Sequence, residues 1–259
     1  MNVALLEPST PLPPGVRACV TLRGVDAEGD FAARVEEGVA GGSEGAARRD
    51  HLRALLGVER IEFLDQVHGI DVHRVGAGAP ASTPRADAAV TTCHGVACAV
   101  LTADCLPVLF WTESGECVGA AHGGWRGLAA GVLEATLDAM RAASGVAPES
   151  VSAWLGAAIG PESFEVGPEV REAFLARRRT TVPAGELAKC FRAGRGDRWF
   201  ADLYSLARVR LAAAGVTAVT GGGFDTFADA ARFHSYRRDG THAGRQASLI
   251  WIDGVSRSS

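Results

Sequence analysis

The chain has 259 residues, and its 26 Lys and Arg against 30 Asp and Glu give a net charge of −4. With 47% hydrophobic and 22% charged residues, it has the composition of a soluble globular protein rather than of a disordered chain. No apolar run approaches the roughly 20 residues that a membrane-spanning helix needs, and the mild acidity argues against nucleic acid as the main partner.

The six cysteines are too few for a disulfide-rich scaffold, and no two of them form a Cys-x-x-Cys pair. The first twelve residues lack the basic segment and the long apolar run of a signal peptide. We therefore expect a cytoplasmic protein with reduced thiols and no membrane partner.

The apolar pattern predicts about ten strands and four helices, without strict alternation of the two. The predicted strands are Arg17–Leu22, Ile61–Val67, Val72–Val75, Ala88–Thr91, Val96–Leu101, Val108–Trp111, Cys117–Ala121, Val151–Leu155, Val216–Thr220 and Ser248–Ile252. The predicted helices are Ala46–Leu56, Leu128–Ala143, Pro168–Arg178 and Asp202–Ala214, the last with Asp202 as its N-cap. This arrangement favours a mixed-sheet α/β fold over a Rossmann or TIM-barrel fold.

The segment Thr102–Pro107 (TADCLP) follows a predicted strand and holds the first candidate for chemistry. We expect Pro107 to prevent a simple continuation of the strand, which leaves Cys105 at a strand end facing a cleft. The alternative is that Cys105 is a small buried hydrophobic residue, as free cysteines often are.

The segment Ala121–Gly127 (AHGGWRG) joins a predicted strand to the start of a predicted helix. The glycines after His122 allow a close approach of the backbone to a ligand, and a helix start favours an anion. Arg126 adds a guanidinium that suits phosphate or carboxylate. The alternative is a plain turn with a solvated arginine.

His68 lies at a third strand end, beside Gly69. Two imidazoles and a thiolate from His68, Cys105 and His122 are a sufficient protein ligand set for catalytic zinc with one open position. Their spacings match no local zinc motif, so three unrelated core or turn residues are the alternative interpretation.

Near the C-terminus, Arg237, Arg238 and Arg245 concentrate positive charge in an acidic protein. They are candidates for an anion or substrate clamp. The alternative is a surface network of arginines paired with Asp239.

Five ordered blocks of the sequence resemble the laccase-domain family, whose members are also described as polyphenol oxidases, purine nucleoside phosphorylases or peptidoglycan editing factors. The blocks are QVHG, TADCLPVLF, AAHGGWRG, AWLGAAIGP with the following FEVG, and SYRRDG with the following GR. The resemblance runs from about Val16 to Ile252. It implies one α/β domain over residues 1–259, built as an α/β/β/α layered sandwich.

The resemblance also implies a metal site at His68, Cys105 and His122, which are the same three residues, and conserved arginines at Arg126, Arg237 and Arg238. The chain departs from the family pattern at Arg48-Arg49-Asp50 and Asp225-Thr226-Phe227, among other places. These departures leave the expected ligands intact and bear on the identity of the substrate.

The activity implied by the resemblance is phosphorolysis of adenosine, inosine, guanosine or methylthioadenosine, together with deamination of adenosine. Zinc at the three ligands would lower the pKa of a bound water towards about 7, and Arg126, Arg237, Arg238 and Arg245 would bind substrate or phosphate. Trp125, Phe164 and Tyr236 are candidates for stacking on a purine, and Asp104 is a candidate general base.

Two other interpretations stay open at this point. One is a metal-free amide hydrolase acting on peptidoglycan precursors, with Cys105 as nucleophile and His122 or His68 as base. Another is a metal-dependent binding protein without turnover. A multicopper oxidase fails on ligand count, because the chain has seven histidines and no His-x-His pair, although copper in one site would explain some oxidase activity.

Overall fold

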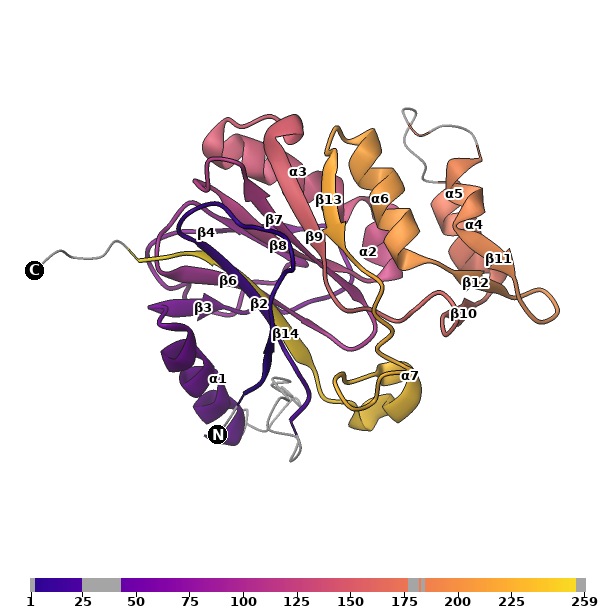
Figure 1. Ribbon diagram of the computed structural model, residues 1–259, viewed down its shortest axis with the longest axis horizontal. Helices are drawn as coiled ribbons and strands as arrows, with labels where there is room; N and C mark the ends of the chain where they lie inside the picture. The colour runs from indigo at the N-terminus through magenta and orange to yellow at the C-terminus, as the bar shows by residue number, and fades with distance from the viewer. Residues whose placement is uncertain (1–2, 25–42, 177–181, 183–184, 255–259) are drawn as a thin grey trace, which may run out of the picture.

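Two mixed β-sheets lie face to face and are covered by helices on both outer sides, as Figure 1 shows. The computed structural model describes residues 3–24, 43–176, 182 and 185–254. This arrangement confirms the predicted α/β/β/α layers with mixed sheets.

The five-stranded sheet has the order β1-β2-β14-β6-β3. Its strands are β1 (Leu5–Leu6), β2 (Val16–Thr21), β14 (Gln246–Ile252), β6 (Val96–Thr102) and β3 (Arg60–Glu62). All neighbours are antiparallel except β3 and β6, which are parallel. One helix, α1 (Ser43–Leu56), packs on its outer face through Leu52.

The six-stranded sheet has the order β13-β9-β7-β8-β5-β4. Its strands are β13 (Ala218–Gly221), β9 (Val151–Leu155), β7 (Leu106–Thr112), β8 (Val118–Gly123), β5 (Ala88–Thr91) and β4 (Val72–Val75). The edge strand β13 pairs with β9 in parallel, and the other edge strand, β4, pairs with β5 in parallel. The four central strands are antiparallel to one another.

Three helices cover the outer face of the six-stranded sheet, α2 (Trp125–Ala130), α3 (Val132–Ser144) and α6 (Leu203–Ala213), and α4 (Pro168–Ala176) packs against α2 and β12 (Trp199–Ala201). A small sheet of β10 (Glu165–Val166), β12 and β11 (Phe191–Ala193) lies beside them with α5 (Glu186–Lys189). Short turns complete the chain: η1 (Pro148–Ser150), α7 (Tyr236–Asp239) and η2 (Gly240–His242).

The central strands are buried on both faces, so their side chains alternate between two apolar cores. In β7, Leu109 and Trp111 pack between the sheets, whereas Val108 and Phe110 pack under the helices. In β14, Ile250 faces the other sheet while its neighbours contact the α1 side. This double burial explains the continuous apolar runs in the sequence.

The predicted helix Leu128–Ala143 was wrong in its bounds and its continuity. The helical segment begins at Trp125, and Gly131 interrupts it with φ of 115° in the left-handed region. The predicted apolar face is nevertheless buried, including Leu128, Leu133 and Met140. Helical periodicity continues through such a break, so the pattern could not reveal it.

The predicted end of the strand before Pro107 is confirmed, because β6 ends at Thr102, but the proline itself lies within β7, which begins at Leu106 in the other sheet. The carbonyl of Pro107 accepts the N–H of Gly156, just beyond β9. The nitrogen of Pro107 therefore lies on the side of the end of β9, where no strand residue needs its N–H. A sheet tolerates proline in such a position.

The predicted strand Ile61–Val67 is shortened to Arg60–Glu62, because the chain leaves the sheet at Phe63 to cross to the other one. The predicted strand Cys117–Ala121 extends through Gly123, and Val216–Thr220 begins later, at Ala218. The predicted N-cap is confirmed, since the Asp202 side chain accepts the N–H of Ser205. The last two residues of the predicted helix Pro168–Arg178 lie outside the described residues.

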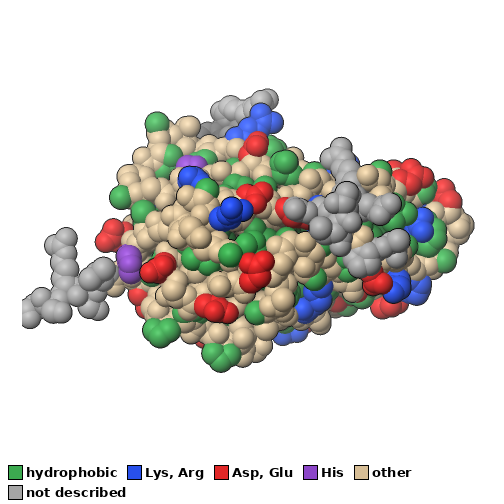
Figure 2. Space-filling view, turned by 90° about the horizontal axis from the view of Figure 1, so that it is seen from above, with side chains coloured by type: hydrophobic (Ala, Val, Ile, Leu, Met, Phe, Trp, Pro, Cys, Tyr) green, Lys and Arg blue, Asp and Glu red, His purple; other side chains and the backbone are tan. Residues whose placement is uncertain are grey.

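Figure 2 shows one face of the molecule, on which acidic and basic side chains are interspersed with apolar ones. Among the residues that the structure describes, no helix is both long and apolar enough to span a lipid bilayer.

Candidate metal centre

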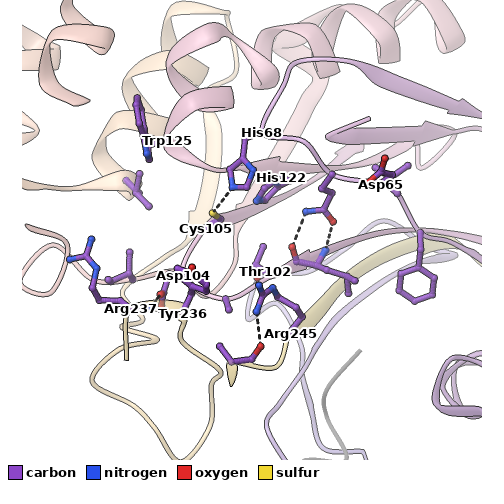
Figure 3. Close-up of a pocket in the computed structure, with 18 of the residues that line it drawn as sticks. Asp65, His68, Thr102, Asp104, Cys105, His122, Trp125, Tyr236, Arg237 and Arg245 are labelled. Carbon is purple, nitrogen blue, oxygen red and sulfur yellow. Dashed lines mark hydrogen bonds between the residues drawn. The ribbon is translucent and has the colours of Figure 1, made fainter. Parts of the chain in front are cut away.

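Two chain crossings between the sheets position the candidate ligands. Cys105 lies in the short connection from β6 to β7, which carries the chain from the five-stranded to the six-stranded sheet. His68 lies in the connection from β3 to β4, which crosses the same way. His122 is near the end of β8, in register with Pro107 of β7. The three side chains therefore meet at one end of the sandwich (Figure 3).

The three predicted ligands form a compact group. Their ligand atoms all lie within 4.8 Å of one another, and the Cys105 Sγ is 3.9 Å from the His68 Nε2. The His68 and His122 rings meet edge to face, with centroids 4.8 Å apart. In the described part of the chain, this is the one such group of His, Cys, Asp or Glu residues that could hold a metal ion.

The group opens on one side to a large cavity. His122 is buried, Cys105 is partly buried and His68 is exposed, so solvent reaches the centre from the His68 side. The cavity has a volume of about 1130 Å³, and all three side chains line it. An open side of this kind separates a catalytic metal site from a closed structural one.

Asp87, directly before β5, organises both histidines. Its buried carboxylate accepts the backbone N–H groups of Val67, His68 and Gly69 and also the Nδ1–H of His122, at 2.8 Å. A carboxylate can only accept, so the proton is on Nδ1 and the His122 Nε2 is left for a ligand. Carboxylates commonly orient metal-binding histidines in this way.

The local charges favour a thiolate beside a protonated histidine when no metal is bound. Burial alone would raise the pKa of the Cys105 thiol, but the charge of His122 and hydrogen bonds from His122 and His68 lower it to about 6. Burial likewise opposes the charging of His122, but the Cys105 thiolate and the hydrogen bond to Asp87 raise its pKa to about 9. A deprotonated sulfur is the form that binds metal.

Two non-glycine residues with positive φ shape the crossings. His68 has φ of 60° and Asp104 has φ of 89°, in the region that side chains rarely adopt. The Asp104 carboxylate accepts hydrogen bonds from the Thr226 hydroxyl at 2.6 Å and from the backbone N–H of Arg237 at 2.7 Å. Both of its oxygens therefore hold the turn that presents Cys105.

The glycines of GGWRG are required by close approaches at two places. A Cβ on Gly124 would lie 2.7 Å from the His68 Cδ2 and 3.3 Å from the Cys105 Sγ. A Cβ on Gly127 would lie 2.7 Å from the Gly69 carbonyl oxygen, so α2 packs directly on the His68 loop. These glycines serve close packing around the ligands.

The predicted binding arginines have different surroundings. Arg126 is exposed, stacks 4.3 Å over the Trp125 ring and is not among the residues that line the cavity. The Arg238 guanidinium donates to the carbonyls of Thr226, Phe227 and Phe233 and also binds Asp239. The network with Asp239 is therefore present.

Arg237 and Arg245 both line the cavity. The Arg237 guanidinium donates to the Glu165 carbonyl at 3.0 Å and lies 5.5 Å from the Phe164 ring. Arg245 donates to the carbonyls of Ala243 and Gly244. Figure 3 shows these two arginines on different sides of Asp104.

The proposed aromatic platforms also line the cavity. Trp125, Phe164 and Tyr236 border it together with Ile159 and Leu203. Opposite them, near α1, the lining consists of Arg49, Phe63, Leu64, Asp65, Gln66, Thr83, Leu101 and Thr102.

Sequence reasoning missed Asp87 and Thr226 as parts of this site. The one local signal for Asp87 is a carboxylate directly before the mostly apolar strand Ala88–Thr91, where a buried charge needs a partner. Thr226 has no local signal, because its partner Asp104 is 122 residues away.

Comparisons with known proteins find relatives that are similar to this chain in sequence and solved structures that are similar to it in fold. Residues 42–253 match the family described as multi-copper polyphenol oxidoreductase laccase. A purine nucleoside phosphorylase of Pseudomonas aeruginosa is 48% identical over 258 residues, covering 96% of this chain and 98% of the relative. The Escherichia coli purine nucleoside phosphorylase YfiH is 43% identical over 256 residues, with 96% and 98% covered.

Two solved structures have the same fold. A Neisseria meningitidis protein superposes with a TM-score of 0.84 at 39% identity, covering 96% of this chain and 99% of its own. YlmD from Geobacillus stearothermophilus also superposes with a TM-score of 0.84, at 26% identity, and the alignment covers 96% of each chain. The chain belongs to this laccase-like family, and several of its relatives carry the name purine nucleoside phosphorylase.

Proposed function

We propose that this family member is a zinc-dependent purine nucleoside enzyme that cleaves adenosine, inosine, guanosine or methylthioadenosine with phosphate and deaminates adenosine. The observation that carries the proposal is a group of two imidazoles and one thiolate that opens into an aromatic-lined cavity. In this proposal the partners are a nucleoside and phosphate, not nucleic acid or a membrane, and the location is the cytoplasm.

The donor set fits zinc. Two ligands of a tetrahedral zinc ion, at about 2.1 Å for nitrogen and 2.3 Å for sulfur, lie about 3.6 Å apart, close to the 3.9 Å between the Cys105 Sγ and the His68 Nε2. His68, Cys105 and His122 would hold the ion. When bound, zinc supplies Lewis acidity that activates water near neutral pH.

The protein side chains provide the remaining functions. Asp87 keeps the proton on the His122 Nδ1 and fixes the backbone of the His68 loop. Trp125 and Phe164 offer flat apolar surfaces that suit a purine ring. Arg237 and Arg245 supply positive charge on the cavity wall. Arg126 and Arg238 stay predicted to bind substrate or phosphate, although neither lines the cavity.

The reaction exchanges one bond at the sugar. In phosphorolysis a phosphate oxygen bonds to the sugar C1′, and the C1′–N9 bond breaks. Its electron pair goes to N9, and the purine takes up a proton as it leaves. The products are a sugar 1-phosphate and the free base. In deamination, water replaces the amine at C6 and ammonia is released.

The direct test incubates the zinc-loaded protein with adenosine, with and without phosphate, and separates the products by chromatography. We expect adenine only when phosphate is present and inosine in both reactions. Cys105→Ala should lower both rates more than about a hundredfold, the scale seen for loss of a group that stabilises a transition state.

Cys93→Ala is the matched control, because its half-buried thiol contacts the Val75 carbonyl and does not line the cavity. This variant should keep full activity. If Cys105→Ala retains wild-type rates on every nucleoside, the metal-centre proposal is wrong.

A second candidate is a metal-free amide hydrolase acting on peptidoglycan precursors, and one observation favours it. The Cys105 thiolate beside a protonated His122 is the pairing that cysteine nucleophiles use. Purification without metal, together with turnover of muropeptides that iodoacetamide abolishes, would favour this candidate. One tightly bound zinc per chain would exclude it.

Copper in the same site, supporting polyphenol oxidation, is distinguished by metal analysis and by a phenol oxidation assay on zinc- and copper-loaded protein. A folded, zinc-loaded protein that turns over neither nucleosides nor muropeptides would instead be a metal-dependent binding protein.

A further inference from the structure

The α1 end of the cavity contains an arginine that the proposed reaction has not yet used. Arg49 projects from α1 and lines the cavity. Its guanidinium lies 4.3 Å over the ring of Phe63, which is buried. Its Nε is buried and has no hydrogen-bond partner, and among the described residues no carboxylate pairs with it.

This environment is costly for a cation without an anion. Burial lowers the pKa of Arg49, since the charged form loses hydration. Guanidinium nevertheless stays protonated in proteins, so its charge requires compensation by a ligand or by solvent. Arg192, which lies at a similar distance over Phe200 (4.5 Å), has such an anion, since it binds Glu162 at 2.6 Å.

The Phe63 ring also restrains the guanidinium. The central carbon of that group lies 4.3 Å from the ring centroid, so the ring limits where the side chain can lie. A guanidinium is a rigid planar fork that matches two oxygens of a phosphate. Less conformational entropy is lost on binding when the side chain is already restrained.

A second arginine lines the same cavity. Arg245 directly precedes β14, whose first residue Gln246 pairs with Thr102 of β6. Three arginines, Arg49, Arg237 and Arg245, line the cavity together with two carboxylates, Asp65 and Asp104. The arginines and carboxylates that line the cavity therefore carry more positive than negative charge.

We propose that Arg49, with Arg245, forms an oxyanion subsite at the α1 end of the cavity that binds the phosphate consumed in phosphorolysis. This assignment of the ligand rests on the proposed function. The nucleoside base then occupies the Trp125 and Phe164 end, and its sugar lies between the two.

The test measures binding of inorganic phosphate to the zinc-loaded full chain by isothermal titration calorimetry. We expect Arg49→Gln to raise the phosphate Kd at least tenfold. Arg53→Gln is the matched control, since it lies on the same helix, is paired with Asp50 and does not line the cavity. Arg53→Gln should leave the Kd unchanged, and Arg49→Lys, which keeps the charge but loses the fork, should weaken binding less than Arg49→Gln.

Adenosine binding without phosphate serves as the internal standard, and it should be equal in the wild type and in Arg49→Gln. Adenosine 5′-monophosphate separates the two sources of a phosphate group. If Arg49→Gln weakens the nucleotide and not inorganic phosphate, the assignment to free phosphate is overturned. Equal phosphate Kd values in the wild type, Arg49→Gln and Arg49→Lys would overturn the subsite itself.

The two proposals fail separately. If the wild type turns over nucleosides and Arg49→Gln leaves the phosphate KM unchanged, the subsite is wrong and the function stands. If no nucleoside is turned over but Arg49→Gln abolishes phosphate binding, the anion subsite stands and its role in phosphorolysis is refuted.

Discussion

At the scale of single residues, Asp87 links the fold to the centre. One buried carboxylate accepts four hydrogen bonds, three from the loop of one proposed ligand and one from the ring of another. Burial alone would raise the pKa of Asp87, but these hydrogen bonds hold it below its ordinary value. Its stabilising effect is therefore present at neutral pH and is lost as the pH falls through its lowered pKa.

Replacing Asp87 by Asn tests this role. An amide has one acceptor oxygen, so at least one of the N–H groups loses its partner, at a cost of about 1–3 kcal/mol for each buried donor. We expect a lower free energy of unfolding and a zinc affinity reduced about 10- to 100-fold, as for other partners of metal-binding histidines. Urea denaturation and competition with a zinc chelator measure the two effects. Unchanged zinc affinity would show that Asp87 serves only the fold.

Cys105 provides a second test at this scale. In metal-free protein its pKa of about 6 leaves it mostly thiolate at pH 7, whereas an ordinary thiol is mostly protonated. Alkylation by iodoacetamide should therefore follow a pH profile with a midpoint near 6, and added zinc should block it. Peptide mass spectrometry identifies the modified residue. A midpoint at or above 8 would contradict the interaction with His122.

How much the sequence could predict also depends on the residue. Cys105 and His122 lie at strand ends beside turn-forming residues, and the same local pattern at His68 completed the proposed ligand set. Asp87 and Thr226 act through partners 18 to 122 residues away, so no local pattern identifies them. For Arg126, the position at a helix start predicts an anion site, and the structure places its side chain over Trp125, so this role stays a prediction.

At the scale of elements, the junction of β8 and α2 brings the site together. The chain passes from His122 through two glycines into a helix that rests on the His68 loop. The sequence predicted most strands within a few residues, because strands buried on both faces give continuous apolar runs. It did not predict the break at Gly131 or the strand through Pro107, since both depend on what neighbouring elements contact.

Gly124→Ala tests the junction. Its methyl group would lie 2.7 Å from the His68 ring, so the ring must move while the strand and helix keep their backbone. We expect weaker zinc binding and slower nucleoside turnover, with a nearly unchanged melting temperature of the metal-free protein. Gly78→Ala, whose added methyl meets nothing within 4 Å, is the control. Equal zinc affinity in both variants would mean that the His68 ring has room to shift.

At the scale of the whole molecule, the centre joins the two sheets. Two of its three side chains come from connections that cross between the sheets, and the third comes from the six-stranded sheet itself. A bound ion would therefore restrain both crossings against the six-stranded sheet.

Metal removal tests this coupling. A ligand at 100 times its Kd stabilises the folded state by about 2.7 kcal/mol, which for a chain of this size corresponds to a rise in Tm of about 5–10 °C. Chelator-treated protein should melt lower by that amount and recover with zinc, whereas Cys105→Ala should melt at one temperature in both conditions. Identical melting of wild-type protein with and without zinc would contradict a metal centre formed by these residues.

The place of β14 in the five-stranded sheet has a consequence for biosynthesis. This strand, residues 246–252, lies between β2 and β6, which are translated long before it. During synthesis, the nascent polypeptide has a gap in the middle of that sheet until β14 is available. Arg245 directly precedes the same strand, so the cavity wall is completed in the same step. A partly synthesised chain without β14 therefore exposes two unpaired strand edges, the kind of edge that invites wrong pairing with other chains.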